Sequence, residues 1–391
     1  MLIYDRRVTV LPRRAVLLLA VLLTATLAAA LSAAESRAAP RVPAGFFGVH
    51  VRSLQGGDYG AMRRAGVGVV RTGFSYSVVR PQPLSGYDWS TFDAYVGGTA
   101  EQGIDLLPVV YGTPPWMPFV GGVSILAEPL ASEWQKYLTA LVDRYGSGGK
   151  FWTLHPEIPY HPVRYWQIWN EPNSFVNWNE PSPRQYGELL ARSAATIHAA
   201  DPAARVVSAG VVAQPLDDIT EPGADYLRRM FRSPAAAAAA DVIALHPYTK
   251  GPGSMTKLIR QTRKTMTRAG LGRTPIWITE VGWGAGAPKP KTTRGLTPEV
   301  PGRWSQTKAK QRSKLRRALA TAVEQRRKLG IGRIIWYQWQ DGPDPACAWC
   351  VSAGLIRQDG TPKPLLSDFS RIANSRRAPL QSPGAGPRSR R

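Results

Sequence analysis

The chain alternates between short, almost entirely apolar runs and longer segments in which apolar residues recur every three or four positions. The run from Tyr165 to Trp169 is typical of the first kind, because it is too short for a stable helix and is dominated by apolar and aromatic residues. Such runs indicate strands buried on both faces, as in a parallel sheet covered by helices. The sequence contains eight of them, at residues 45–52, 67–74, 104–111, 165–169, 205–212, 241–246, 275–280 and 333–339.

The segments between these runs have the periodicity of amphipathic helices. Regular alternation of strands and helices predicts an α/β protein, and eight repeats predict one closed (β/α)8 TIM barrel. A doubly wound sheet is disfavoured because no glycine-rich phosphate loop follows the first strand. The expected helices lie at residues 59–65, 89–102, 130–145, 183–199, 223–232, 255–269 and 308–329.

Two of the predicted strands end on a glutamate. The fourth is followed by Asn170, Glu171 and Pro172, and the seventh ends at Glu280. In a parallel barrel the carboxyl ends of all strands lie at one face, so the two carboxylates are expected to converge. Paired carboxylates are what glycosidic bond hydrolysis requires, one to protonate the leaving oxygen and one to attack or to activate water.

Each of these signals has a structural alternative. Asn170-Glu171-Pro172 alone is also typical of a helix start, where an acidic side chain and an early proline are favoured. Arg71 lies inside an apolar strand and therefore needs a carboxylate partner, which is either a catalytic glutamate or any buried acid. The two glutamates together, on strands of one predicted barrel, favour the catalytic interpretation.

Residues 45–372 resemble the clan A glycoside hydrolases, most closely family 39 and family 5-like enzymes. The motifs that carry this resemblance are Trp-Asn-Glu-Pro after the fourth strand, Thr-Glu at the end of the seventh, and His246-Pro-Tyr248 at the end of the sixth. The resemblance implies retaining chemistry on a (β/α)8 barrel. It makes Glu171 the general acid/base and Glu280 the nucleophile.

The resemblance also implies supporting roles. Asn170 would bind the sugar 2-hydroxyl, and Arg71 and Tyr248 would hold Glu280, with His246 in the same network. Trp339 would form the platform beneath the sugar, although Trp336 on the same strand competes for that role. The sequence departs from family 5 at Tyr111, where those enzymes have histidine, so the resemblance does not extend to the details of the sugar subsites.

Residues 1–34 have the pattern of a secretory signal peptide. Arginines precede an apolar run at residues 15–31, and small residues at 32–34 offer a cleavage site. An uncleaved membrane anchor is the alternative, since the run is near the minimum length that spans a bilayer. Both predict export to an extracellular or cell-wall location. Residues 35–44 are expected to be a linker, and residues 373–391 a disordered basic tail.

Cysteine usage fits an exported protein. Cys347 and Cys350 are the only two cysteines, and their spacing predicts a small loop disulfide in an oxidising compartment. A structural zinc site is disfavoured without a second cysteine pair. A thioredoxin-like redox motif is also disfavoured, because the pair does not open a helix after a first strand.

The formal net charge of +23 is concentrated between Lys250 and Lys328 and in the tail. Such charge attracts anionic polysaccharides, phosphate-rich polymers or membranes, but an Arg-rich solvated surface is an equally good interpretation. Lys289, Lys291 and Arg294 follow Glu280 and suggest an acidic or phosphorylated glycan as substrate. No nucleic-acid recognition motif accompanies the charge, so only nonspecific binding of that kind is expected.

The sequence therefore predicts a secreted retaining β-glycosidase that hydrolyses a polysaccharide or oligosaccharide by double displacement. No cofactor and no metal are expected, and the protein is expected to be a monomer without a membrane partner once its signal is cleaved. Two alternatives share the fold: a transglycosylase, in which a sugar hydroxyl replaces water, and an inactive glycan- or wall-binding barrel. A polycationic nucleic-acid binder rests on charge alone.

Overall fold

The computed structural model describes residues 41–54, 57–114, 116–117, 126–215, 220–286, 305–343, 347 and 349–376. The predicted signal peptide, most of the predicted linker and the last fifteen residues of the predicted tail lie outside this part of the chain. The final helix runs to Arg376, four residues beyond the expected end of the catalytic domain.

Nine parallel strands form one curled sheet in the order β5-β4-β3-β2-β1-β11-β8-β7-β6. The eight expected strand segments supply these nine strands. Their bounds differ from the expected ones by at most a few residues, except in the fifth segment, which supplies both β5 and β6. The strands are β1 (Phe47–His50), β2 (Val69–Ser75), β3 (Asp105–Tyr111), β4 (Tyr165–Ile168), β5 (Arg205–Val207), β6 (Val211–Val212), β7 (Ile243–His246), β8 (Ile276–Val281) and β11 (Ile331–Tyr337), with β9 (Gly284–Ala285) and β10 (Ser305–Gln306) as a separate pair.

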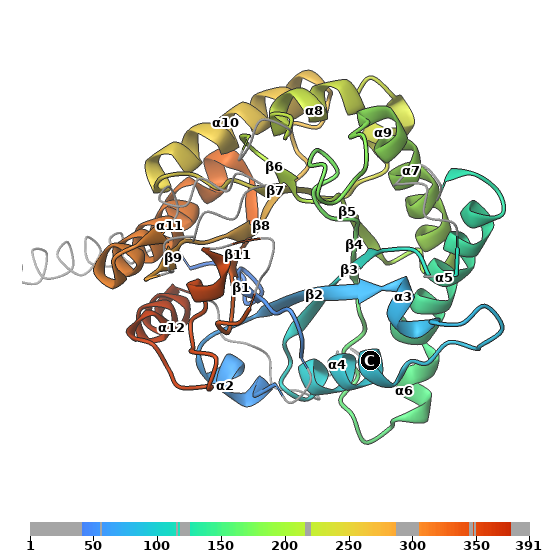
Figure 1. Cartoon of the computed structure of the whole chain (residues 1–391), viewed down its shortest axis with the longest axis horizontal. Coiled ribbons are helices and arrows are strands. Elements are labelled where there is room, and N and C mark those ends of the chain that lie inside the picture. Colours follow the sequence, from blue (N-terminus) through green and yellow to red (C-terminus); the bar gives the residue numbers. More distant parts are fainter. Residues whose placement is uncertain are drawn as a thin grey trace, which may run out of the picture. The chain divides into compact units, whose positions relative to one another are not determined.

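Helices surround the curled sheet on its outer side (Figure 1). Within the described residues, no helix is both long and apolar enough to span a membrane. The alanine-rich stretch at residues 235–240 lies largely in a short helix. The helices are α2 (Tyr59–Arg64), α3 (Tyr76–Val79), α4 (Ser90–Glu101), α5 (Leu130–Tyr145), α6 (Lys150–Leu154), α7 (Pro183–Ala200), α8 (Gly223–Met230), α9 (Pro234–Ala238), α10 (Pro252–Arg268), α11 (Lys308–Leu329) and α12 (Pro364–Arg376).

The fifth strand was expected to be continuous, but it is split into β5 and β6. The amide of Ala209, between the two pieces, donates to the Tyr186 hydroxyl of α7 and not to a neighbouring strand. The two pieces are the two edges of the sheet in its strand order. At Val207 the segment bridges in parallel to Val242, and the Ser208 amide donates to the Val242 carbonyl at 2.9 Å. Backbone hydrogen bonds thus connect both ends of the curled sheet.

Side chains that face the inside of the curl form their own core layer. This inner layer is separate from the larger core between the strands and the helices. Residues two positions apart on a strand share a face, so each inner-layer residue shows which other side chains of its strand also face the inside of the curl. The inner layer consists of Val69, Leu107, Val207, Val242, Ala244, Trp277 and Ile335, with Tyr165 packed against it.

Cys347 and Cys350 form the disulfide that their spacing predicts. The loop they close places Trp349 in the core, with its ring edge-on to Tyr248 at 5.3 Å and tilted toward Tyr337 at 6.0 Å. The crosslinked loop therefore packs against Tyr248 and Tyr337, which lie at the carboxyl ends of β7 and β11.

A buried arginine occupies the opposite, amino-terminal end of the inner layer. Arg333 places its guanidinium 4.4 Å from the ring centre of Trp277 and 4.8 Å from that of Tyr165. Its Nη2 atom donates to Asp105 Oδ2 at 2.6 Å, and His161 contacts the other oxygen. Burial raises the pKa of the Asp105 carboxyl, but the charge of Arg333 and the contact with His161 outweigh burial and hold that pKa below its usual value.

We expect Asp105→Asn to lower the free energy of unfolding by roughly 1–3 kcal/mol at neutral pH, because it leaves Arg333 without its carboxylate. A carboxyl with a lowered folded-state pKa stabilises the protein above its ordinary pKa near 4, and that contribution is lost as the pH falls further. Urea denaturation at pH 7 and pH 3 measures both effects. Asp225→Asn breaks the exposed ion pair with Arg228 and is the matched control, which should lower the free energy of unfolding by less than about 0.5 kcal/mol. An equal loss in both variants would refute a stabilising role for the pair between Asp105 and Arg333.

Candidate active site

The polar residues predicted to be functional lie together at the carboxyl ends of the strands. His246 ends β7, and Asn170 and Glu171 follow β4, while His50, which was not predicted, ends β1 beside them. Arg71 lies inside β2, two positions after the inner-layer residue Val69, so it faces the same interior. Their positions on separate strands explain how residues far apart in the sequence reach one site.

Glu280 faces the site because β8 is irregular. Ile278 and Val281 both pack in the outer core although they are three positions apart, and the pairing of β8 with β11 shifts register between them. One extra residue in β8 therefore lies between two outward side chains. This shift turns the Glu280 carboxylate toward the interior, where only 9% of its side chain is exposed.

Arg71 connects Glu280 to three other strands. Its Nη1 atom lies 2.5 Å from Glu280 Oε1 and 3.0 Å from His50 Nδ1. Its Nη2 donates to Asn170 Oδ1 at 2.7 Å, and its Nε donates to Gln167 Oε1, also at 2.7 Å. The guanidinium is 1% exposed, so these bonds replace the water that a buried cation has lost.

The surroundings of Glu280 favour its ionised form. Burial alone raises the pKa of Glu280, but His246, Arg71 and His50 and the hydrogen bond from the Tyr248 hydroxyl together lower it to about 2. The Tyr248 hydroxyl donates to Glu280 Oε2 at 2.5 Å, and burial beside the two glutamates raises its own pKa well above 10. Glu280 is thus a stable anion held by two donors on its two oxygens.

Glu171 lies on a backbone turn that carries strain. Trp169 and Glu171 have φ angles of 70° and 42°, in the left-handed region that costs a non-glycine residue about 1–2 kcal/mol. The turn is fixed by hydrogen bonds from the Trp169 amide to Val110 and from the Glu171 amide to Gly210. The buried side chain of Asn173 fastens the following loop to the backbone of Val212.

The Glu171 carboxylate has two polar partners and some access to solvent. His246 Nδ1 lies 2.6 Å from Oε1, and the Asn177 side-chain amide donates to Oε2 at 3.2 Å. The side chain is 17% exposed, about twice the figure for Glu280. Of the two carboxylates, Glu171 is therefore the one with better access to solvent.

His246 lies between the two glutamates. Its Nε2 atom is 3.7 Å from Glu280 Oε1, is buried and has no hydrogen-bond partner in the described structure. The ring packs directly over Gly210, where an added Cβ would lie 2.0 Å from Nε2. Gly210 therefore defines the position of the His246 ring, and through it the orientation of Glu171.

Ligand atoms of Glu171, His246 and Glu280 all lie within 4.8 Å of one another, which is compact enough to bind a metal ion. However, both oxygens of Glu280 are already engaged, by the Arg71 guanidinium and the Tyr248 hydroxyl. A divalent cation would have to approach a buried guanidinium and displace its bonds. The donor set favours acid–base and nucleophilic chemistry over metal binding.

Three aromatic residues at the end of β11 and just after it differ in the direction they face and in their burial. Trp336 faces the outer core, since its neighbour Ile335 belongs to the inner layer, and Trp339 is only 3% exposed. Tyr337 shares the inward face with Ile335, is half-buried, and stacks on His50 with ring centres 5.0 Å apart. The role given to Trp339 stays a prediction, and Tyr337 presents more surface for it. Tyr111 at the end of β3 is 38% exposed.

Sequence reasoning missed four contributors to the site: His50, Gln167, Asn177 and Gly210. Gln167 carried a signal, because it is the one uncharged polar residue within an otherwise apolar strand, and its Nε2 also donates to the Ser208 carbonyl. Gly210 had no signal of its own, since its importance depends on the ring of His246.

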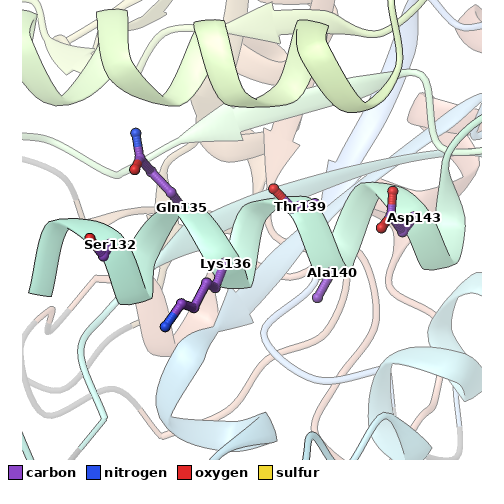
Figure 2. A pocket seen from close by; sticks show the side chains of 6 residues that line it. All are labelled: Ser132, Gln135, Lys136, Thr139, Ala140 and Asp143. Atoms are coloured by element: carbon purple, nitrogen blue, oxygen red, sulfur yellow. The ribbon is translucent and has the colours of Figure 1, made fainter.

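A surface hollow lies away from this site, on the outer face of α5 (Figure 2). All of its lining side chains come from that single helix, and none is a member of the catalytic group. They are Ser132, Gln135, Lys136, Thr139, Ala140 and Asp143.

The chain belongs to the glycosyl hydrolase catalytic core family, which matches residues 161–366, a stretch that contains both glutamates. This family match identifies the protein as a glycoside hydrolase. No curated protein sequence matches the chain.

Solved glycosidase structures share the fold. A family 39 glycoside hydrolase from Bacteroides cellulosilyticus is 19% identical over 85% of this chain and 64% of that chain, with a TM-score of 0.57. A monomeric beta-xylosidase from Caulobacter crescentus is 19% identical over 86% and 69%, with a TM-score of 0.59. An enzyme designated GH5_18 from Bifidobacterium longum subsp. infantis is 17% identical over 86% and 80%, with a TM-score of 0.59. The chain thus spans about two thirds of the length of the first two.

We expect Gly210→Ala to reduce kcat/KM by about 10²-fold or more, because the new methyl group collides with His246 and displaces the partner of Glu171. Gly253→Ala, where an added Cβ meets nothing within 4 Å, is the matched control and should keep wild-type activity. The double variant Gly210→Ala/His246→Ala removes the collision, so its melting temperature should exceed that of Gly210→Ala. Unchanged activity of Gly210→Ala would show that the position of the His246 ring does not depend on Gly210.

We also expect His50 to make stability depend on pH. Burial, and then the charge of Arg71, lower the pKa of His50 to about 3, so between about pH 6.5 and 3 the unfolded chain binds a proton that the folded protein does not. Stability should therefore fall as the pH drops through this range, and less steeply in His50→Asn, whose amide oxygen still accepts from Arg71. Urea midpoints at pH 7 and pH 4 measure this, with His155→Asn as the control; identical slopes in wild type and His50→Asn would exclude the effect.

Proposed function

We propose that the protein is an exported, monomeric retaining β-glycosidase that hydrolyses a polysaccharide or oligosaccharide. In this proposal the curled sheet is the closed (β/α)8 barrel that eight strand signals predict, and no metal takes part. The observation that carries the proposal is the pairing of a firmly ionised Glu280 with a more exposed Glu171, with oxygens of the two within 4.8 Å.

That separation supports retention over inversion. Retaining enzymes keep their carboxyl groups about 5–5.5 Å apart, whereas inverting enzymes separate them by about 6.5–9.5 Å to admit a water molecule between. Oxygens within 4.8 Å fit the first geometry. Water would therefore enter only after the first half of the reaction.

In the first step Glu280 forms a bond to the anomeric carbon while the bond to the leaving oxygen breaks. Glu171 delivers its proton to that oxygen, so the leaving group departs as a neutral alcohol. Arg71 and Tyr248 keep the nucleophile ionised and oriented. The amide nitrogen of Asn170 is available for the sugar 2-hydroxyl, because its oxygen accepts from Arg71.

In the second step water attacks the anomeric carbon and releases Glu280. The glycosyl ester has no negative charge, and Glu171, now a carboxylate, takes a proton from the attacking water. His246, at 2.6 Å from Glu171, holds this carboxylate in place through both steps. Two inversions at the same carbon leave the product with the original β configuration.

The test is hydrolysis of aryl β-glycosides and polysaccharides by wild type, Glu171→Ala and Glu280→Ala. Each substitution should reduce kcat by about 10²–10⁴-fold or more. Azide should restore Glu280→Ala with a glycosyl azide of inverted configuration, and NMR should show a β product from wild type. Exposed Glu188 supplies the control variant Glu188→Ala, which should be unaffected.

Full activity of Glu280→Ala, or an α anomer as the first product, would refute the mechanism. Transfer of the glycosyl group to sugar hydroxyls in place of water would identify a transglycosylase. Binding on a glycan array without cleavage by wild type would favour the inactive binding barrel.

A further inference from the structure

Two adjacent helices carry much of the positive charge of the described structure. α10 and α11 pack against each other on the outer side of the sheet (Figure 1). α10 contains five Lys and Arg residues and no acidic residue, and α11 contains nine with Glu324 as its one acidic residue. Such an imbalance within two neighbouring helices calls for an explanation.

Some of these cations have structural roles. Arg312 and Arg316 bind Asp368 of α12, and Arg263 donates to backbone carbonyls, including that of Leu329. The exposed ones have no ion-pair partner among the described residues, and we refer to this set as the basic wall. The basic wall consists of Lys257, Arg260, Lys264 and Arg268 on α10 and Lys308, Lys310, Arg317, Arg327 and Lys328 on α11.

The members on α10 are spaced three or four positions apart and therefore form one stripe along the helix. With 1.5 Å of rise per residue, α10 is about 25 Å long and α11 about 33 Å. Like charges arranged along such a length repel one another without counter-ions. A linear anionic polymer neutralises several of them at once and releases its own condensed ions.

The chemistry of the basic wall distinguishes among polyanions. The large exposed apolar side chains of the described structure all lie on other elements, so α10 and α11 offer nothing to insert into a membrane. They also offer no exposed aromatic ring on which nucleic-acid bases would stack. A hydrated polymer that carries carboxylate or phosphate groups fits a surface of cations and small polar residues.

The basic wall also begins next to the catalytic end of the sheet. α10 starts in the loop that follows β7, and His246 ends that strand. Because a helix after a parallel strand runs back toward the amino end, the first residues of α10 lie at the catalytic face. A polymer bound along α10 therefore reaches the face where Glu171 and Glu280 lie.

We propose that the basic wall binds a linear anionic polysaccharide and holds it beside the catalytic face. The choice of a glycan over other polyanions rests on the proposed glycosidase function, whereas the location of the surface does not. Binding outside the catalytic residues would retain the enzyme on an acidic polymer between cleavage events.

The test compares two triple variants that remove the same charges, in a Glu280→Gln background that prevents cleavage. Arg260→Gln/Lys264→Gln/Arg268→Gln alters the basic wall. Arg164→Gln/Lys150→Gln/Arg232→Gln removes two arginines and one lysine that are exposed and unpaired elsewhere in the described structure. Affinity for polymannuronate, a β-linked linear polyuronate, and for a neutral β-glucan is measured at 50 and 200 mM NaCl.

We expect the wall variant to bind polymannuronate at least tenfold more weakly at 50 mM NaCl and the control variant to change less than threefold. The slope of log Kd against log salt concentration should fall by about two to three in the wall variant alone. Neutral glucan should bind equally to all proteins. Equal losses in both variants would overturn the proposal.

Single-stranded DNA and vesicles rich in phosphatidylglycerol serve as competing probes. Tighter binding of either one to the basic wall would reassign the surface to nucleic acid or to a membrane. Separately, the wall triple variant with Glu280 intact should hydrolyse a neutral aryl β-glycoside at the wild-type rate. Failure of the glycosidase proposal therefore appears in that assay, and failure of the wall proposal appears in the binding assay.

Discussion

The buried guanidinium of Arg71 is the interaction on which the site depends. A cation removed from water is costly unless each of its donors has a partner, and here the partners come from β1, β4 and β8 and from the turn after β4. These elements are linked only through the curled sheet. Because Arg71 of β2 bonds to all of these partners, the positions of Glu280, Asn170 and His50 depend on one another. Displacement of one partner moves the guanidinium and thereby disturbs the others.

The two glutamates differ because their partners differ. Glu280 is enclosed by a guanidinium and a phenol, both of which stabilise its negative charge. Glu171 meets an imidazole and a carboxamide on a strained turn and is more exposed. His246 touches both environments and couples them. One fold thus gives two identical side chains distinct electrostatic environments by a choice of neighbours and not by a choice of residue type.

Much of this arrangement was predictable from the sequence, because strands buried on both faces are recognisable as short apolar runs. Glu171, Glu280 and Arg71 stand out as charged residues within or directly after such runs. The irregularity in β8 was not predictable, since it follows from the packing of Ile278 and Val281 together. The break between β5 and β6 coincides with a hydrogen bond from Ala209 to the Tyr186 hydroxyl of the preceding helix α7, and the importance of Gly210 depends on a ring from another strand.

The disulfide loop lies one contact away from the hydrogen bond between Tyr248 and Glu280. Cys347 and Cys350 enclose Trp349, whose ring packs against Tyr248, and Tyr248 donates directly to Glu280. The tryptophan is also buried in the core, and the Gln338 side chain donates to the Cys350 carbonyl at 3.1 Å, so the crosslink adds to these contacts by restricting the unfolded loop. Protein prepared in a reducing cytoplasm and protein matured under oxidising conditions therefore differ by one covalent constraint beside Tyr248, and the expression compartment becomes part of the description of a sample.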